Sequence, residues 1–93
     1  MALNESAERE VIALGEKARN LLEDEAFIHV CKMLEKEYWE RFKREALTPE
    51  LRALLQAKAQ VLDDVRAGLH VMMDAGTTAI HRRDKRERTG DRR

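Results

Sequence analysis

The stretch Ala46-Leu47-Thr48-Pro49-Glu50-Leu51 decides the fold, because it marks the start of a helix in the middle of a 93-residue chain. Pro49 disfavours helix at Thr48 and suits the first position of a new helix. Thr48 is a natural N-cap, and Glu50 complements the positive end of the helix dipole. We therefore expect a corner between two antiparallel helices at this point.

The helix that follows is predicted to run from Pro49 to about Ala75, with Gly76 as its C-cap. Leucine recurs every seven residues along it, at Leu55, Leu62 and Leu69. Six further apolar residues widen this line: Leu51, Leu54, Val61, Val65, Met72 and Met73. The resulting stripe is broader than a two-stranded seam needs, which indicates burial against more than one helix.

Two helices are predicted before the corner, over residues 6–22 and 25–45. The apolar pattern shifts near residue 22, and Asp24 is suited to cap the second helix. A single continuous helix with a phase shift is the alternative. Gly15 lies inside the first helix, where it indicates either a local weakness or the close approach of a partner helix.

The composition limits the class of protein. Charged residues make up 39% of the chain, with only 4 Gly and 1 Pro, so a turn-rich sandwich or barrel is excluded. The length excludes a two-domain enzyme with an enclosed cleft. We expect an all-α helical hairpin of two to three helices that assembles into an oligomeric bundle. Residues 1–80 form the single helical domain of this prediction, and residues 81–93 form a basic C-terminal tail.

Charge is balanced over the whole chain but not along it. Residues 1–80 carry 15 acidic and 11 basic residues, whereas residues 81–93 carry 7 basic and 3 acidic residues. The basic residues of this tail are Arg82, Arg83, Lys85, Arg86, Arg88, Arg92 and Arg93. They could bind phosphates, an acidic protein patch or the acidic body of the protein's own oligomer. Alternatively, residues 81–88 extend the helix and the last five residues fray.

No metal site is expected. A structural zinc site needs about four nitrogen or sulfur ligands, and the candidate ligands are His29, Cys31, His70 and His81. His29 and Cys31 are two residues apart, so they point to different sides of a helix. Glu25 and His29 are four apart, which does not match the Glu-x-x-His spacing of carboxylate-bridged metal bundles.

No catalytic residue is expected either. Asp63 and Asp64 are adjacent, so on a helix their carboxylates point about 100° apart and do not converge on one atom. The four glycines stand at positions 15, 68, 76 and 90 and form no phosphate-binding loop. We therefore predict a protein that is not an enzyme and needs no cofactor.

The cellular setting is predicted from what the sequence lacks. No run of about 18 apolar residues is present, so no membrane span is expected. The first residues do not read as a secretory signal. The single cysteine excludes an intrachain disulfide and fits a reducing compartment. We expect a cytoplasmic protein.

Two sets of residues are candidates for contacts with other chains. Trp39 and Tyr38 are predicted partner contacts, because Trp and Tyr are common interface anchors. The predicted oligomer interface lies on one helix and comprises Leu51, Leu55, Leu62, Val65, Leu69 and Met72.

The sequence also carries a recognisable pattern over residues 19–76. Its parts are Leu21-Leu22-Glu23-Asp24-Glu25-Ala26-Phe27, Tyr38-Trp39, the turn Thr48-Pro49-Glu50, Leu62-Asp63-x-Val65-Arg66-x-x-Leu69 and Asp74-x-Gly76. This pattern resembles a loose group of small all-α proteins encoded among bacteriophage head and virion-assembly genes. The resemblance implies a component that acts by protein contact, with no catalytic residue.

Two functions follow from these observations. The first is a non-enzymatic phage-type structural, assembly or interaction protein that self-associates, as a dimer or higher oligomer, and docks on a phage or host protein. The alternative is a small accessory protein that binds nucleic acid through the basic tail. The acidic body counts against this alternative, because it would be repelled by phosphates.

Overall fold

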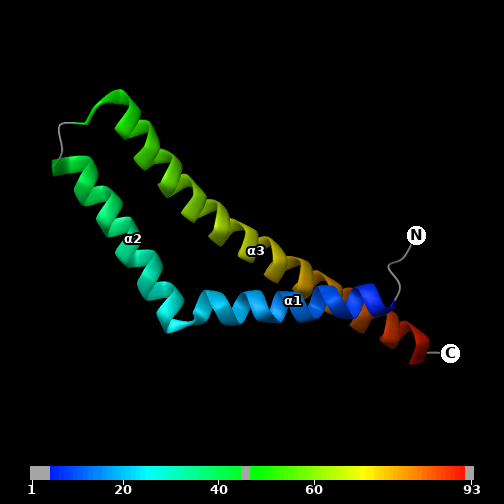
Figure 1. Ribbon diagram of the computed structural model, residues 1–93. Coiled ribbons are helices and arrows are strands. Elements are labelled where there is room, and N and C mark those ends of the chain that lie inside the picture. The colour runs from blue at the N-terminus through cyan, green and yellow to red at the C-terminus, as the bar shows by residue number, and fades with distance from the viewer. Residues whose placement is uncertain (1–4, 45–46, 92–93) are drawn as a thin grey trace. The chain divides into compact units, whose positions relative to one another are not determined.

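The computed structural model of the protein (Figure 1) describes residues 5–44 and 47–91, and nearly all of these residues are helical. Helix α1 spans Glu5–Glu23, α2 spans Glu25–Arg44 and α3 spans Pro49–Asp91. No strand is present within the two described ranges. The predicted all-α fold class is therefore confirmed.

Both predicted internal helix starts are confirmed by capping hydrogen bonds. The Asp24 carboxylate accepts a hydrogen bond from the backbone N–H of Phe27 at 2.9 Å, so α1 and α2 are separate helices. The Thr48 hydroxyl accepts a hydrogen bond from the backbone N–H of Leu51 at 3.2 Å. Residues 45–46, which the prediction placed at the helix end and in the corner, lie outside the described residues.

The predicted end of the third helix is wrong. Helix α3 does not stop near Ala75 but continues to Asp91. Gly76 is not a C-cap, because a glycine cap requires a positive φ angle and no described glycine has one. The alternative that residues 81–88 extend the helix is confirmed, so most of the basic tail is helical.

Contacts between helices divide the chain into two units, and α3 contributes to both. One unit is Leu22–Ala67, in which α2 and the first part of α3 form an antiparallel hairpin around the corner at Thr48 (Figure 1). The buried side chains of this hairpin are Cys31 and Leu55. Half-buried residues of α2, among them Phe27, Leu34 and Tyr38, cover the same side of that helix.

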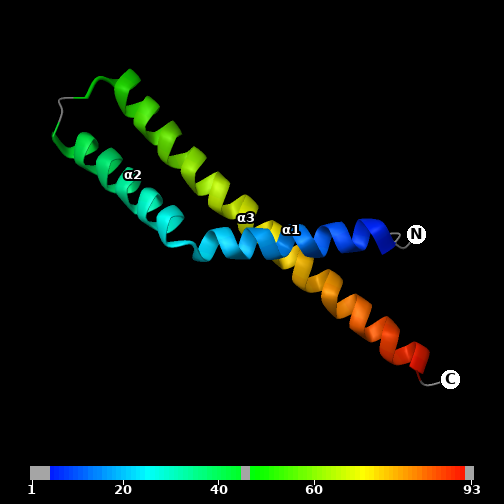
Figure 2. The same ribbon diagram turned by 60° about the horizontal axis from the view of Figure 1, so that its bottom comes forward.

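The other unit pairs α1 with the second part of α3, from Gly68 onwards. The two helices cross where Gly15 meets Gly76 (Figure 2). A methyl group on Gly15 would lie 2.9 Å from the Cα atom of Gly76, so only glycine permits this backbone approach. Ala18 and Ala79, each three residues further on, are buried at the same crossing. Of the two interpretations of Gly15, the close approach of a helix is the correct one.

Candidate functional site

A row of exposed apolar side chains runs along the first half of α3. Leu51, Leu54, Val61 and Val65 are 45%, 51%, 61% and 47% exposed. Together with the exposed Lys58 they follow one another at spacings of three and four residues, which is the spacing of a coiled-coil seam. We call these five residues the α3 stripe. Leu55 and Leu62 lie beside it on the helix. Leu55 is buried and lines a groove together with residues of α2, and Leu62 is half-buried.

Some residues of the predicted oligomer interface are exposed, whereas others are buried by contacts within the chain. Leu51 and Val65 are exposed and belong to the α3 stripe. The other four, from Leu55 to Met72, are partly or fully buried within the chain: Leu55, Leu62, Leu69 and Met72. Two stripe residues, Leu54 and Val61, were absent from the predicted interface although the sequence shows them in the broad apolar line.

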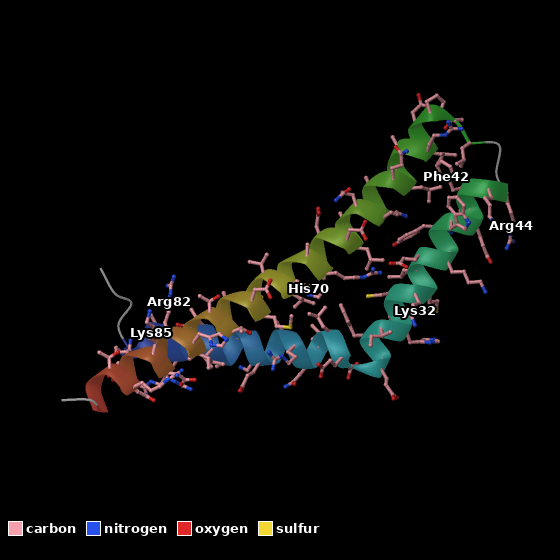
Figure 3. The ribbon with its side chains drawn as sticks, turned by 180° about the vertical axis from the view of Figure 1, so that it is seen from behind. Lys32, Phe42, Arg44, His70, Arg82 and Lys85 are labelled. Carbon is pink, nitrogen blue, oxygen red and sulfur yellow. The ribbon has the colours of Figure 1, made fainter. Side chains whose placement is uncertain are left out.

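Trp39 is the most exposed aromatic residue among those described, at 59%. Its ring stacks on that of Phe42, with centroids 6.2 Å apart and an interplanar angle of 5°. Trp39 also makes a cation–π contact, in which the Nζ atom of Lys43 lies 5.4 Å from the centroid of the indole ring. Phe42 lies on the side of α2 that faces α3 (Figure 3), and Arg52 of α3 covers its ring. The indole is thus held in place while much of its surface stays open.

A groove of about 410 Å³ adjoins Trp39 between α2 and α3. Its lining is mainly apolar and aromatic, with Glu35 and Asp63 as its acidic residues. Tyr38, the other predicted partner contact, is half-buried and lines the same groove. The two predicted contact residues are therefore brought together, Tyr38 in the groove wall and Trp39 at its open edge.

One ion pair links α2 and α3 within the hairpin. Arg66 of α3 donates a hydrogen bond to the Glu35 carboxylate on α2. The bond to Glu35 raises the pKa of Arg66 above its ordinary value. Neither Arg66 nor Glu35 was a candidate in the sequence, because 31 residues separate them and no local pattern relates them. Cys31, also on α2, is buried.

A second ion pair ties α1 to the end of α3. Arg86 donates two hydrogen bonds to the Glu8 carboxylate, at 2.8 and 3.2 Å. The Glu8 side chain is only 12% exposed. The hydrogen bonds from Arg86 lower the pKa of Glu8 below its ordinary value, more than its burial raises it. The sequence contains one indication of this pair. Glu8 lies seven positions before Gly15 and therefore on the same buried face of α1, where an acidic side chain requires a basic partner.

The remaining basic residues of the tail divide by helical position. The Nε atom of Arg83 lies 3.8 Å from the Oδ1 atom of Asp84. Arg82, Lys85 and Arg88 are exposed, and Arg82 and Lys85 lie near each other on the last turns of α3 (Figure 3). A shallow hollow of about 450 Å³ is lined by His81, Lys85, Arg88 and Thr89. The last two predicted tail residues, Arg92 and Arg93, lie outside the described residues.

The His, Cys, Asp and Glu side chains are scattered over the part of the chain that the structure describes. No three or more His, Cys, Asp or Glu side chains converge there as a metal site would require. None of the helices in that part is long and apolar enough to cross a membrane. Three surfaces have distinctive side chains: the α3 stripe, the Trp39 groove and the basic end of α3.

Comparison of the chain with protein-family models, curated proteins and solved structures finds no match.

Proposed function

We propose that this protein is a non-enzymatic, phage-type assembly protein that self-associates and docks on a partner protein. Self-association is assigned to the α3 stripe and partner docking to Trp39 with its groove. The phage setting rests on the resemblance over residues 19–76, and the host cytoplasm or the virion is the corresponding location. The observation that carries the proposal is the exposed apolar seam on α3.

The spacing of the α3 stripe supports a helical partner. Residues at alternating spacings of three and four face one direction and interdigitate with the same pattern on a second helix. Lys58 occupies the middle position of the seam. A polar residue at such a position lowers stability but selects register and oligomer state. A second copy of the chain supplies a complementary seam, so the proposed occupant is the same surface of another molecule.

The energy available is of the right size for such a contact. Complete burial of a Leu or Val side chain contributes about 1.5–3 kcal/mol, and the four apolar stripe residues are about half exposed. Burying all eight in a dimer would therefore contribute roughly 6–12 kcal/mol, against an association cost of about 4–15 kcal/mol. We expect a concentration-dependent dimer or higher oligomer of moderate affinity.

Trp39 is suited to hold a partner protein. Large aromatic side chains at the centre of an interface contribute much of the binding energy when water is excluded from them. The stacked Phe42 and the cation of Lys43 hold the indole in one position, so little further ordering is needed on binding.

Light scattering on purified full-length protein tests the self-association. Val61→Glu places a charge in the middle of the α3 stripe, and we expect this variant to be a monomer while the unchanged protein is an oligomer. Val71→Glu is the matched control, because Val71 is 66% exposed on the same helix but lies outside the seam spacing. The control should keep the oligomer. Equal effects of both substitutions, or a monomeric unchanged protein, would contradict the proposal.

A further inference from the structure

The helix sorts the basic residues near the C-terminus into two groups. Arg86 is bound to Glu8 on α1, and Arg83 lies next to Asp84, so these two cations are engaged within the chain. Arg82, Lys85 and Arg88 make no ion pair within the part of the chain that the structure describes. We define the outer basic face as these three residues and their two polar neighbours: His81, Arg82, Lys85, Arg88 and Thr89.

Neither of the two acidic side chains that the structure describes in this segment lies between the cations of the outer basic face. In the sequence Asp84 and Glu87 alternate with the bases. On a helix that turns 100° per residue, their mean direction lies about 130° away from that of the outer basic face. Glu87 points away from the face, and Asp84 borders it beside Arg88 without separating the three cations. The three cations follow one another over about 9 Å of helix axis.

The chemistry of this face distinguishes its partner. Protein interfaces centre on apolar or aromatic anchors, and the outer basic face contains none. It offers hydrogen-bond donors: two guanidinium groups, an ammonium group and an imidazole. The Thr89 hydroxyl already donates to the Lys85 carbonyl, so it can only accept. Arg and Lys side chains are common donors to the phosphate oxygens of nucleic acids. The hollow lined by His81, Lys85, Arg88 and Thr89 gives a phosphate group a concave surface to bind.

We propose that the outer basic face binds the phosphate backbone of nucleic acid, without selecting a base sequence. The surface is separate from the α3 stripe and from Trp39, so the inference does not depend on self-association or on a protein partner. Because three cations replace condensed counterions, the logarithm of the affinity should fall with the logarithm of salt concentration with a slope of about −2.7. Between about 50 and 200 mM salt, this corresponds to a roughly 40-fold loss of affinity.

Fluorescence anisotropy tests the proposal, with the full chain titrated into a labelled duplex of about 20 base pairs at several salt concentrations. The variant Arg82→Gln/Lys85→Gln/Arg88→Gln should lose at least ten-fold in affinity at low salt, and its salt slope should approach zero. The matched control is Lys17→Gln/Lys32→Gln/Lys36→Gln, which removes the same charge from exposed positions on α1 and α2. The control should bind within about two-fold of the unchanged protein, because phosphate contacts act locally.

Three results would overturn the proposal. The first is no binding of the unchanged protein at low salt, and the second is an equal loss in both triple variants. The third is equal binding of a poly-glutamate peptide, which would assign the face to acidic proteins instead. Circular dichroism of each variant checks that the helices are retained. The salt slope of the unchanged protein tests the proposal even if a variant unfolds.

Discussion

Two glycines, Gly15 and Gly76, bring two helix backbones into direct contact. A Cβ atom on either one would lie about 3 Å from the Cα atom of the other, at 2.9 and 3.0 Å. The opposing group is backbone rather than a movable side chain, so the helices must separate to admit a methyl group. At this crossing a side chain as small as that of alanine is already too large.

Gly15→Ala should destabilise the protein by about 1–3 kcal/mol, as overpacked positions do, although alanine is the better helix former. Gly68→Ala is the control, since Gly68 is also inside a helix but a Cβ atom there would meet nothing within 4 Å. The control should gain about 0.5–1 kcal/mol. Urea unfolding at one fixed protein concentration measures both values. A stabilising Gly15→Ala would show that the crossing is not tight.

The Glu8–Arg86 pair predicts a dependence of stability on pH. Arg86 lowers the pKa of Glu8 in the folded state below its ordinary value of 4.5. The unfolded chain therefore takes up this proton first as the pH falls. The stabilisation is complete above the ordinary value and is lost as the pH falls through the lowered value.

Comparison with Glu8→Gln isolates this effect. At neutral pH the unchanged protein should be the more stable of the two, and the difference should shrink below pH 4.5. Thermal unfolding at a series of pH values provides the measurement. A difference that stays constant across the acidic range would mean that the Glu8 carboxylate is not held by Arg86 in solution.

At the scale of the helices, α3 begins at a single capping residue. The Thr48 hydroxyl accepts a hydrogen bond from the backbone N–H of Leu51 at 3.2 Å. Thr48→Ala should therefore cost about 1 kcal/mol of stability, measured by chemical unfolding. Thr78→Ala is the control, because Thr78 is exposed inside the same helix and caps nothing. If both substitutions had the same effect, the cap would contribute nothing.

Local chemistry made the helix starts predictable, whereas the end of α3 was not. Asp24 and Thr48 act within three residues of themselves, so their roles are visible in the sequence. Gly76 has the composition of a C-cap, but its actual role depends on Gly15, 61 positions earlier. A glycine at a helix end and a glycine at a helix crossing look the same in sequence. The basic segment was consequently separated from the helix to which it belongs.

The candidate interface was predictable only in part, for a related reason. Apolar spacing shows how wide the stripe on α3 is, but not which side α2 covers. Leu55 turns out to be covered, while Val65 and Val61 remain exposed. The side that α2 covers is set by contacts between helices such as those of Arg66 with α2, which no short-range pattern encodes.

At the scale of the whole molecule, the hydrophobic core is small. Among the described residues, the buried hydrophobic side chains are Ala18, Cys31, Leu55 and Ala79, while eleven large hydrophobic residues are exposed. A chain of this length buries a modest share of its surface on folding by itself. Self-association would supply the missing burial, which links the stability of the fold to the proposed function.

This link predicts that thermal stability depends on protein concentration. The unfolding temperature of the unchanged protein and of Val71→Glu should rise with concentration, because association favours the folded state. That of Val61→Glu should not change, since its seam is interrupted. Differential scanning calorimetry over a wide concentration range provides the comparison. The same concentration dependence in all three proteins would place the association elsewhere on the surface.

Sedimentation equilibrium of the unchanged full-length protein tests the central claim most directly. At several loading concentrations, the measured mass should equal two or more chains and fall toward one chain only on dilution. That result would support the α3 stripe as a surface covered by a second copy. A mass of one chain at every concentration would contradict the account, because the exposed seam would then remain open to solvent in the native state.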